Sequence, residues 1–205
     1  MARDADIVRA ANRITAGRMM NGGRLCLCPD YALVPGERLD EFLEHAERAW
    51  RTWPTIAENP YYPWIVDENN YIRLKNLVDD AESKGAKIRT LRPNGEEPSS
   101  AQHRWMAPTL AWNLDAGMRL YHEEVFGPVL SVIPYDAVHD VVAQIAERPP
   151  PLAAYWYGPS SPEYEIFSQR VRLAVCPETI LPSTSFPTVH RSAAWATVGS
   201  ATTTE

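Results

Sequence analysis

Apolar residues recur at helical spacing in several stretches of the chain, and short apolar runs separate these stretches. In the first stretch, Ile7, Ala11 and Ile14 share one helical face, and residues 21–23 (Asn-Gly-Gly) are a typical helix stop. Residues 36–53 show the clearest amphipathic pattern, with apolar residues three and four positions apart. Further helices are predicted over residues 67–85 with Asp67 as the N-cap and Gly85 as the end, over 136–147 with Asp136 as the N-cap, and over 161–171.

The apolar runs between the helices predict strands. These runs are YALV (31–34), AKIRT (86–90), MAPTLAWNL (106–114), PVLSVIPY (128–135) and LAAYWYG (152–158). Pro108 inside the third run indicates an irregular or edge position, since proline cannot donate to a strand ladder. Strands alternating with helices are typical of an α/β domain, so we expect a twisted, largely parallel sheet flanked by helices.

Composition narrows the class of protein. The chain has 205 residues, of which 45% are hydrophobic and 22% charged, and its net charge is -6. An acidic chain without a Lys/Arg cluster is a poor nucleic-acid binder, and no apolar run approaches the ~18 residues of a membrane helix. Three cysteines, an odd number, argue against a disulfide framework. These features predict a cytoplasmic globular protein with neither nucleic acid nor membrane as partner.

Two of the three cysteines lie one residue apart in NGGRLCLCPDY (21–31). Four interpretations are open for Cys26 and Cys28: a metal site, a redox pair, a catalytic nucleophile, or two small buried hydrophobic residues. A structural metal site needs about four ligands, and the remaining cysteine and the five histidines show no paired spacing, so no metal is expected. A turn made flexible by Gly22 and Gly23, with the cation Arg24 beside it, is compatible with a reactive thiol.

A second stretch, YHEEVFGPVL (121–130), favours the interpretation of a catalytic nucleophile. Together with NGGRLCLCPDY it resembles the aldehyde dehydrogenase superfamily, whose signatures read Asn-x-Gly-Gln-x-Cys and Glu-Glu-x-Phe-Gly-Pro. The resemblance covers roughly residues 5–172, and the Cys-x-x-Pro-Asp-Tyr form is closest to the branch that includes coniferyl aldehyde dehydrogenases. The resemblance implies the catalytic-domain fold of that family over residues 1–175.

The resemblance also implies roles for four residues. Cys26 matches the family nucleophile, which adds to an aldehyde to give a thiohemiacetal and then a thioester that water releases as a carboxylic acid. Asn21 matches the start of the cysteine loop. Glu124 matches the residue that accepts hydrogen bonds from the nicotinamide ribose, and Phe126 matches the aromatic residue beside the nicotinamide. The expected cofactor is NAD or NADP and the expected substrate an aromatic, coniferyl-aldehyde-like aldehyde. Cys28 matches no catalytic position, and a solvated turn is the expected setting for His122 and Glu123.

The sequence also departs from the family pattern. It has no nucleotide-binding domain before the cysteine loop and no Glu-Leu-Gly-Gly segment to supply the water-activating glutamate. Arg24 stands where the motif has Gln, and a guanidinium there either favours the thiolate or blocks the pocket. Residues 176–205 match no family segment, so a divergent and poorly ordered tail is expected, and a reading-frame slip is one explanation.

These departures predict a catalytic-domain fragment that does not turn over aldehyde by itself. The alternative is a non-catalytic remnant or interaction module that pairs with another chain. A homo-oligomer or a complementing chain is therefore a candidate partner, besides the small-molecule aldehyde.

Overall fold

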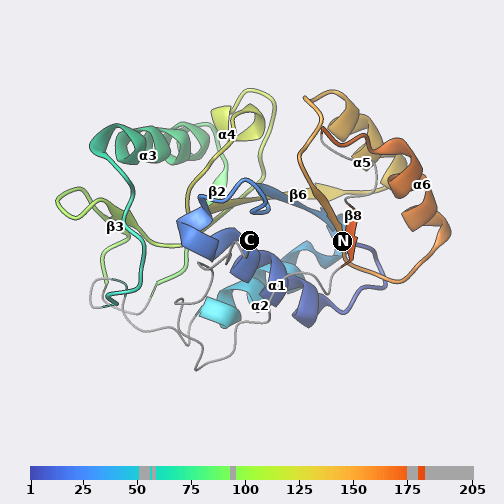
Figure 1. Ribbon diagram of the computed structural model, residues 1–205, viewed down its shortest axis with the longest axis horizontal. Helices are drawn as coiled ribbons and strands as arrows, with labels where there is room; N and C mark the ends of the chain where they lie inside the picture. The colour runs from blue at the N-terminus through green and yellow to red at the C-terminus, as the bar shows by residue number, and fades with distance from the viewer. Residues whose placement is uncertain (51–55, 57–58, 93–95, 175–179, 183–205) are drawn as a thin grey trace, which may run out of the picture.

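The computed structural model describes residues 1–50, 56, 59–92, 96–174 and 180–182, and a mixed four-stranded sheet lies at its centre (Figure 1). The strand order is β1 (Tyr31–Pro35), β6 (Val129–Tyr135), β5 (Thr109–Trp112) and β2 (Lys87–Thr90). β1 and β5 both run parallel to β6, whereas β2 is antiparallel to β5. The predicted α/β class with a largely parallel sheet is confirmed.

The register of the parallel strands determines which loops meet. Tyr31 at the start of β1 lies opposite Ser131 of β6, and Thr109 at the start of β5 lies opposite Val129. The amino ends of all three strands therefore lie at one edge of the sheet. The segment that precedes β1 carries the two neighbouring cysteines, and the segment that precedes β6 carries Glu124. Strand order and register thus bring the two sequence motifs to the same edge.

Helices cover both faces of the sheet, as Figure 1 shows. Val34 and Leu130 point toward the cluster of α1 and α2, whereas Leu33 and Tyr135 belong to the cluster of α5 and α6 on the other face. This alternation follows from the strand period of two. The remaining elements are α1 (Ile7–Met19), η1 (Met20–Gly23), η2 (Gly36–Arg38), α2 (Leu39–Trp50), α3 (Glu68–Ser83), β3 (Ser99–Ser100), β4 (Trp105–Met106), α4 (Arg119–His122), α5 (Val138–Ala146), β7 (Ala154–Trp156), α6 (Pro162–Arg170) and β8 (Ile180–Pro182).

Several predicted helix ends are confirmed. The Asp67 carboxylate accepts from the backbone N–H of Asn70 at 2.8 Å at the start of α3, and Gly85 follows the helix with φ +101°. The prediction that Asp136 caps α5 is wrong, because the N-cap is Ala137 and makes no side-chain bond. Asp136 lies one residue too early, and its carbonyl accepts from the Arg3 guanidinium.

The prediction from Pro108 was an irregular or edge position. The irregular position is confirmed, because Pro108 lies in irregular backbone between β4 and β5, whereas an edge position is not observed. β5 lies between β6 and β2 and begins at Thr109, one residue after the proline. Because Pro108 precedes β5, its lack of an N–H removes no hydrogen bond between β5 and the neighbouring strands. The Pro108 carbonyl still accepts from the N–H of Leu91 at 2.6 Å.

Two further expectations concern regions that the structure describes only in part. The predicted helix over residues 36–53 is observed as η2 and α2 up to Trp50, and 51–53 lie outside the described residues. Of the predicted tail, only β8 is described, and it pairs in parallel with β7. Among the described helices, none combines the length and apolar character that crossing a lipid bilayer requires.

Candidate functional site

The cysteine motif forms a sharp turn after α1. Asn21 has φ +50° and Gly22 φ +62°, so the chain reverses as the helix ends. The Arg24 Nε donates to the Asn21 carbonyl at 3.1 Å, and the N–H of Cys28 donates to the Leu25 carbonyl at 2.9 Å. The second bond closes a tight turn over residues 25–28. Cys26 lies inside this turn and is exposed.

The two thiols of the motif have different surroundings. Cys28 is half-buried, and its Sγ donates to the Met20 carbonyl at 3.5 Å. Burial, the largest cause, raises the pKa of the Cys28 thiol, although the nearby Arg18 guanidinium opposes this shift. Since the thiolate is the nucleophilic form, the geometry favours the exposed Cys26 over Cys28 as the reacting group.

The second motif is an extended segment before β6. The Glu124 side chain is exposed, whereas Val125 beside it is 1% exposed and anchors the segment in the core. Phe126 has φ +47°, which is unusual for a bulky residue, and 42% of the residue is exposed. The Arg73 guanidinium donates to the carbonyls of Glu124 at 3.2 Å and Val125 at 2.6 Å. Helix α3 therefore holds the backbone while the two side chains face outward.

The two motifs are joined along a contact that we call the seam, made by Gly23 with Gly127 and by Asp30 with Val125. A Cβ added to Gly23 would stand 2.0 Å from the Gly127 oxygen, so the two backbones touch where a side chain has no room. The Asp30 Oδ1 accepts from the N–H of Val125 at 3.1 Å and from Arg18 Nη1 at 3.0 Å. The seam fixes the position of the cysteine turn relative to the Glu124 segment.

Arg18 supports the seam from inside the core. The residue is 2% exposed, and its Nη1 also donates to the Pro29 carbonyl at 3.1 Å. Burial lowers the pKa of Arg18, while the charge of Asp30 opposes that shift. Sequence analysis missed this pair, although Arg18 continues the apolar series of Ile7, Ala11 and Ile14 on α1. A charged residue on a buried helical stripe was the available signal.

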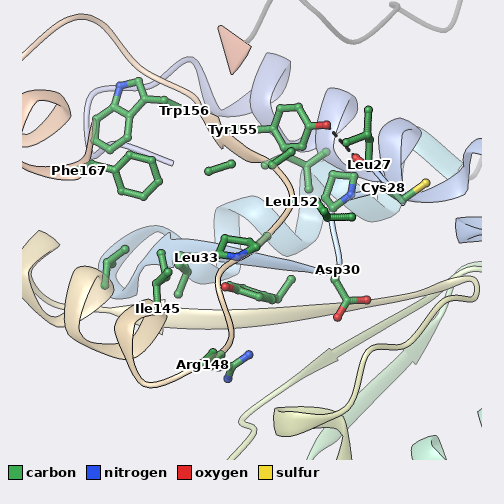
Figure 2. Close-up of a pocket in the computed structure, with 18 of the residues that line it drawn as sticks. Leu27, Cys28, Asp30, Leu33, Ile145, Arg148, Leu152, Tyr155, Trp156 and Phe167 are labelled. Carbon is green, nitrogen blue, oxygen red and sulfur yellow. Dashed lines mark hydrogen bonds between the residues drawn. The ribbon is translucent and has the colours of Figure 1, made fainter. Parts of the chain in front are cut away.

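A cavity of about 510 Å³ opens beside the cysteine turn. Cys26, Cys28, Asp30 and Glu124 line it together, so the structure brings the predicted thiol and the predicted cofactor carboxylate to one cavity. Asn21 and Phe126 are not among the described residues that line it. The other wall is apolar and aromatic, and it includes Leu152, Tyr155, Trp156 and Phe167 (Figure 2).

Two polar contacts border the cavity at different places. The Tyr155 hydroxyl donates to the Leu27 carbonyl at 2.8 Å and ties β7 to the turn (Figure 2). The Arg148 guanidinium lies over the rings of Tyr31 and Tyr121, at 4.9 and 4.5 Å from their centroids. Cation–π contacts of this kind explain how a half-buried cation is held between two aromatic rings.

The two residues before Glu124, His122 and Glu123, make contacts with nearby residues of the chain. Glu123 pairs with Arg119 at 2.6 Å, and this bond lowers the pKa of the Glu123 carboxyl. His122 is exposed at the cavity rim, and its Nε2 lies 2.8 Å from the Ala116 carbonyl. No group of three or more His, Cys, Asp or Glu side chains is arranged to hold a metal ion among the described residues.

Comparisons with known proteins agree on one family. A family model described as "Aldehyde dehydrogenase family" matches residues 1–176. The chain is 39% identical over 171 residues to a probable coniferyl aldehyde dehydrogenase of Caulobacter vibrioides, and 34% identical over 166 residues to the coniferyl aldehyde dehydrogenase of a Pseudomonas species. These alignments cover 83% and 80% of this chain but 35% and 34% of the relatives, so the chain spans about a third of their length.

Solved structures give the same result. The substrate-bound AldH of Staphylococcus aureus superposes with a TM-score of 0.74 at 26% identity, covering 83% of this chain and 36% of that one. A C291A mutant of AldC from Pseudomonas syringae, solved with NAD+ and octanal, superposes with a TM-score of 0.72 at 26% identity, covering 84% and 36%.

Proposed function

Because the chain belongs to the aldehyde dehydrogenase family, we propose that it carries the thiol and the nicotinamide-side residues of an aldehyde oxidation. One observation supports this assignment above the others: Cys26 and Glu124, 98 residues apart in the sequence, line one cavity and are held there by the seam. Residues 1–175 form the catalytic domain in this proposal, and 176–205 a divergent tail.

Cys26 is the proposed nucleophile. Its thiolate sulfur adds to the carbonyl carbon of the aldehyde, and the carbonyl oxygen becomes the negative oxygen of a thiohemiacetal. The backbone N–H of Cys26 is the group proposed to hold this oxygen. Loss of hydride from the same carbon leaves a thioester, which water cleaves to a carboxylic acid and the free thiol. Asn21 is a positioning residue in this scheme, since its left-handed backbone and its carbonyl bond to Arg24 shape the turn.

The residues present fit the nicotinamide end of NAD or NADP. When bound, this cofactor supplies the acceptor for the hydride. An exposed carboxylate, Glu124, can accept hydrogen bonds from ribose hydroxyls, and the exposed ring of Phe126 offers a flat apolar surface for a heteroaromatic ring. Arg73 keeps both side chains in place by binding the backbone of their segment.

The proposed substrate is an aromatic aldehyde of the coniferyl aldehyde type. Two relatives that match over most of this chain carry that substrate in their names. Tyr31 and Tyr155 line the same cavity as Cys26 and supply aromatic surface against which a substituted benzene ring can pack.

The 205-residue polypeptide by itself is proposed to react with electrophiles but not to reduce cofactor. Glu124 and Phe126 can contact only the nicotinamide end, so the hydride acceptor is not held against the substrate, and such positioning is worth about 7 to 11 kcal/mol. The sequence lacks the Glu-Leu-Gly-Gly segment, and losing a general base costs a further ~10²- to 10⁴-fold. The expected result with an aromatic aldehyde and NAD or NADP is no reduced cofactor above that of Cys26→Ala.

The thiol assignment is tested with a chromogenic ester. Cys26 should attack p-nitrophenyl acetate, take the acetyl group as a thioester and release p-nitrophenolate in an initial burst of one equivalent per chain. The burst should vanish in Cys26→Ala and persist in the matched variant Cys28→Ala. A burst that survives Cys26→Ala, or that is lost equally in both variants, contradicts the assignment.

A further inference from the structure

Cys28 is the thiol of the cysteine motif that the proposed aldehyde oxidation does not use. It follows Cys26 by two positions, and Cys26, Leu27 and Cys28 all line the cavity. Both cysteines are free thiols in the structure. Figure 2 shows Cys28 beside Leu27 at the turn. The turn therefore presents two thiol-bearing residues to one space.

The turn keeps the two cysteines within reach of one another. The N–H of Cys28 donates to the Leu25 carbonyl at 2.9 Å, so the chain folds back over residues 25–28. Neighbouring Cα atoms are about 3.8 Å apart, so those of Cys26 and Cys28 lie less than about 7.6 Å apart, and closer in a turn. A disulfide needs a Cα separation of about 4.4 to 6.8 Å. A bond between the two sulfurs therefore needs adjustments within one turn and no movement of a helix or strand.

Electrostatic effects indicate the same proximity. A negative charge on Cys26 raises the pKa of the Cys28 thiol, an effect that charged groups exert on close neighbours. The guanidinium of Arg18, which is 2% exposed, acts on Cys28 in the opposite direction and favours its thiolate. Cys28 thus lies between a buried cation and a second thiol.

The surroundings of the two thiols give them different parts in an oxidation. Cys26 is exposed, so an oxidant in solution can reach its sulfur first. Cys28 is half-buried, and its Sγ donates to the Met20 carbonyl at 3.5 Å. A thiol is a weak donor, so this contact is easily exchanged for a bond to sulfur. Cys26 is thereby suited to be oxidised and Cys28 to react with the oxidised form.

We propose that hydrogen peroxide converts Cys26 and Cys28 to a reversible disulfide, and that Cys28 thereby protects Cys26 from irreversible oxidation. The Cys26 thiolate attacks one peroxide oxygen. The O–O bond breaks, an S–O bond forms, the sulfur gives up two electrons, and the other oxygen leaves as hydroxide. The Cys28 sulfur then attacks the Cys26 sulfur. The S–S bond forms as the S–O bond breaks, and the hydroxide leaves with the Cys28 proton as water.

The proposal does not depend on aldehyde oxidation, because neither step involves an aldehyde or a nicotinamide cofactor. An exposed disulfide is open to reduction by a small thiol, which returns both cysteines to the free form. Without a second thiol, the sulfenic acid of Cys26 meets more peroxide and becomes a sulfinic acid, which dithiothreitol does not reduce.

Peptide mass spectrometry tests the bond itself. Trypsin cleaves after Arg24 and Arg38 and releases residues 25–38 with both cysteines, whereas Cys176 falls in a different peptide. The full chain is treated with hydrogen peroxide, blocked with iodoacetamide and digested without reductant. We expect peptide 25–38 without label and lighter by two hydrogen atoms than the reduced peptide. A link between this peptide and that of Cys176, or a sulfinic acid at Cys26 without the disulfide, overturns the proposal.

Three variants test the protection. The Cys26 thiol that dithiothreitol recovers after peroxide should decay at least tenfold faster in Cys28→Ala than in the parent chain. Cys28→Ser keeps a donor for the Met20 carbonyl and should decay as fast as Cys28→Ala, which separates loss of the thiol from a change in packing. Cys176→Ala removes the cysteine outside the motif and should decay like the parent chain. Equal decay in the parent chain and Cys28→Ala, or protection that persists in Cys28→Ser, overturns the proposal.

Discussion

The seam and the apolar wall of Leu152, Tyr155, Trp156 and Phe167 border the same cavity, but they are built from different interactions. The seam is polar and tight: Asp30 joins Arg18 to the Val125 backbone, and Gly23 touches Gly127. The apolar wall consists of side chains such as Leu152, Trp156 and Phe167, and the rings of Trp156 and Phe167 pack with their centroids 5.3 Å apart. The comparison teaches that directional contacts fix the residues proposed for chemistry, whereas apolar packing without directional bonds forms most of the opposite wall.

The largest effect is expected at the tightest point of the seam. Gly23→Ala puts a Cβ 2.0 Å from the Gly127 oxygen at a residue with φ +77°, so both the backbone conformation and the contact are strained. We expect a loss of about 4 kcal/mol or more in the free energy of unfolding, measured with urea. The matched variant Gly85→Ala, at φ +101° with nothing within 4 Å, should lose only about 1 kcal/mol. Equal losses in the two variants would mean that the backbone conformation alone, and not the contact of Gly23 with Gly127, sets the cost.

A smaller loss is expected when the charge of the seam is removed. Asp30→Ala leaves the Arg18 guanidinium, 2% exposed, without its carboxylate and leaves the Val125 N–H without an acceptor. We expect a loss of about 2 to 3 kcal/mol, below the full value for a buried pair because the Asp30 side chain is 32% exposed. Asp79→Ala, which breaks an exposed pair with Lys75, should cost about 0.5 kcal/mol or less. A loss from Asp30→Ala as small as that from Asp79→Ala would mean that the seam contributes no stability.

The bond that ties the apolar wall to the cysteine turn should contribute less stability than the contacts of the seam. Tyr155→Phe removes the hydroxyl that donates to the Leu27 carbonyl at 2.8 Å. Burial raises the pKa of Tyr155 to about 12, so the hydroxyl remains a neutral donor at working pH. We expect a loss of about 1 kcal/mol, and none for Tyr61→Phe, whose residue is 60% exposed. A loss from Tyr155→Phe as large as that from Asp30→Ala would mean that this wall contributes as much stability as the seam.

The smallest effect concerns Cys28. Burial raises the pKa of its thiol in the folded chain, so the folded state keeps a proton that the unfolded state loses. Stability should therefore fall slightly as pH rises above the unfolded thiol value of about 8.5. For the same reason iodoacetamide should modify Cys26 first at pH 8, which mass spectrometry of peptides can show. Faster modification of Cys28 would contradict the burial assigned to it.

Much of the fold follows from local patterns. The spacing of Phe42, Leu43 and Ala46 predicts the buried face of α2, and all three are buried in the structure. The error at Asp136 is a shift of one residue at the start of a helix, and Pro108 predicts an irregular position but not that β5 begins directly after it. These positions depend on which backbone group finds a partner in three dimensions, and a one-dimensional pattern does not contain that information.

The site was predictable in part. The motifs identify Cys26 and Glu124 as candidates, but their proximity arises from the parallel pairing of β1 with β6, a contact between distant parts of the chain. The Arg18–Asp30 pair could be found only as a charge on an apolar helical stripe, without its partner. The apolar wall was not predictable, since it depends on how β7 and α6 lie relative to the cysteine turn.

Protection of Cys26 by an aldehyde tests the central claim most directly. In the Cys28→Ala variant, the rate of Cys26 alkylation by iodoacetamide is measured with increasing vanillin, and vanillyl alcohol serves as the matched ligand without a carbonyl. If Cys26 adds reversibly to aromatic aldehydes in the cavity, vanillin slows alkylation in a saturable manner and the alcohol does not. Equal rates with both ligands, or equal slowing by both, would contradict the assignment of Cys26 as the aldehyde-binding nucleophile.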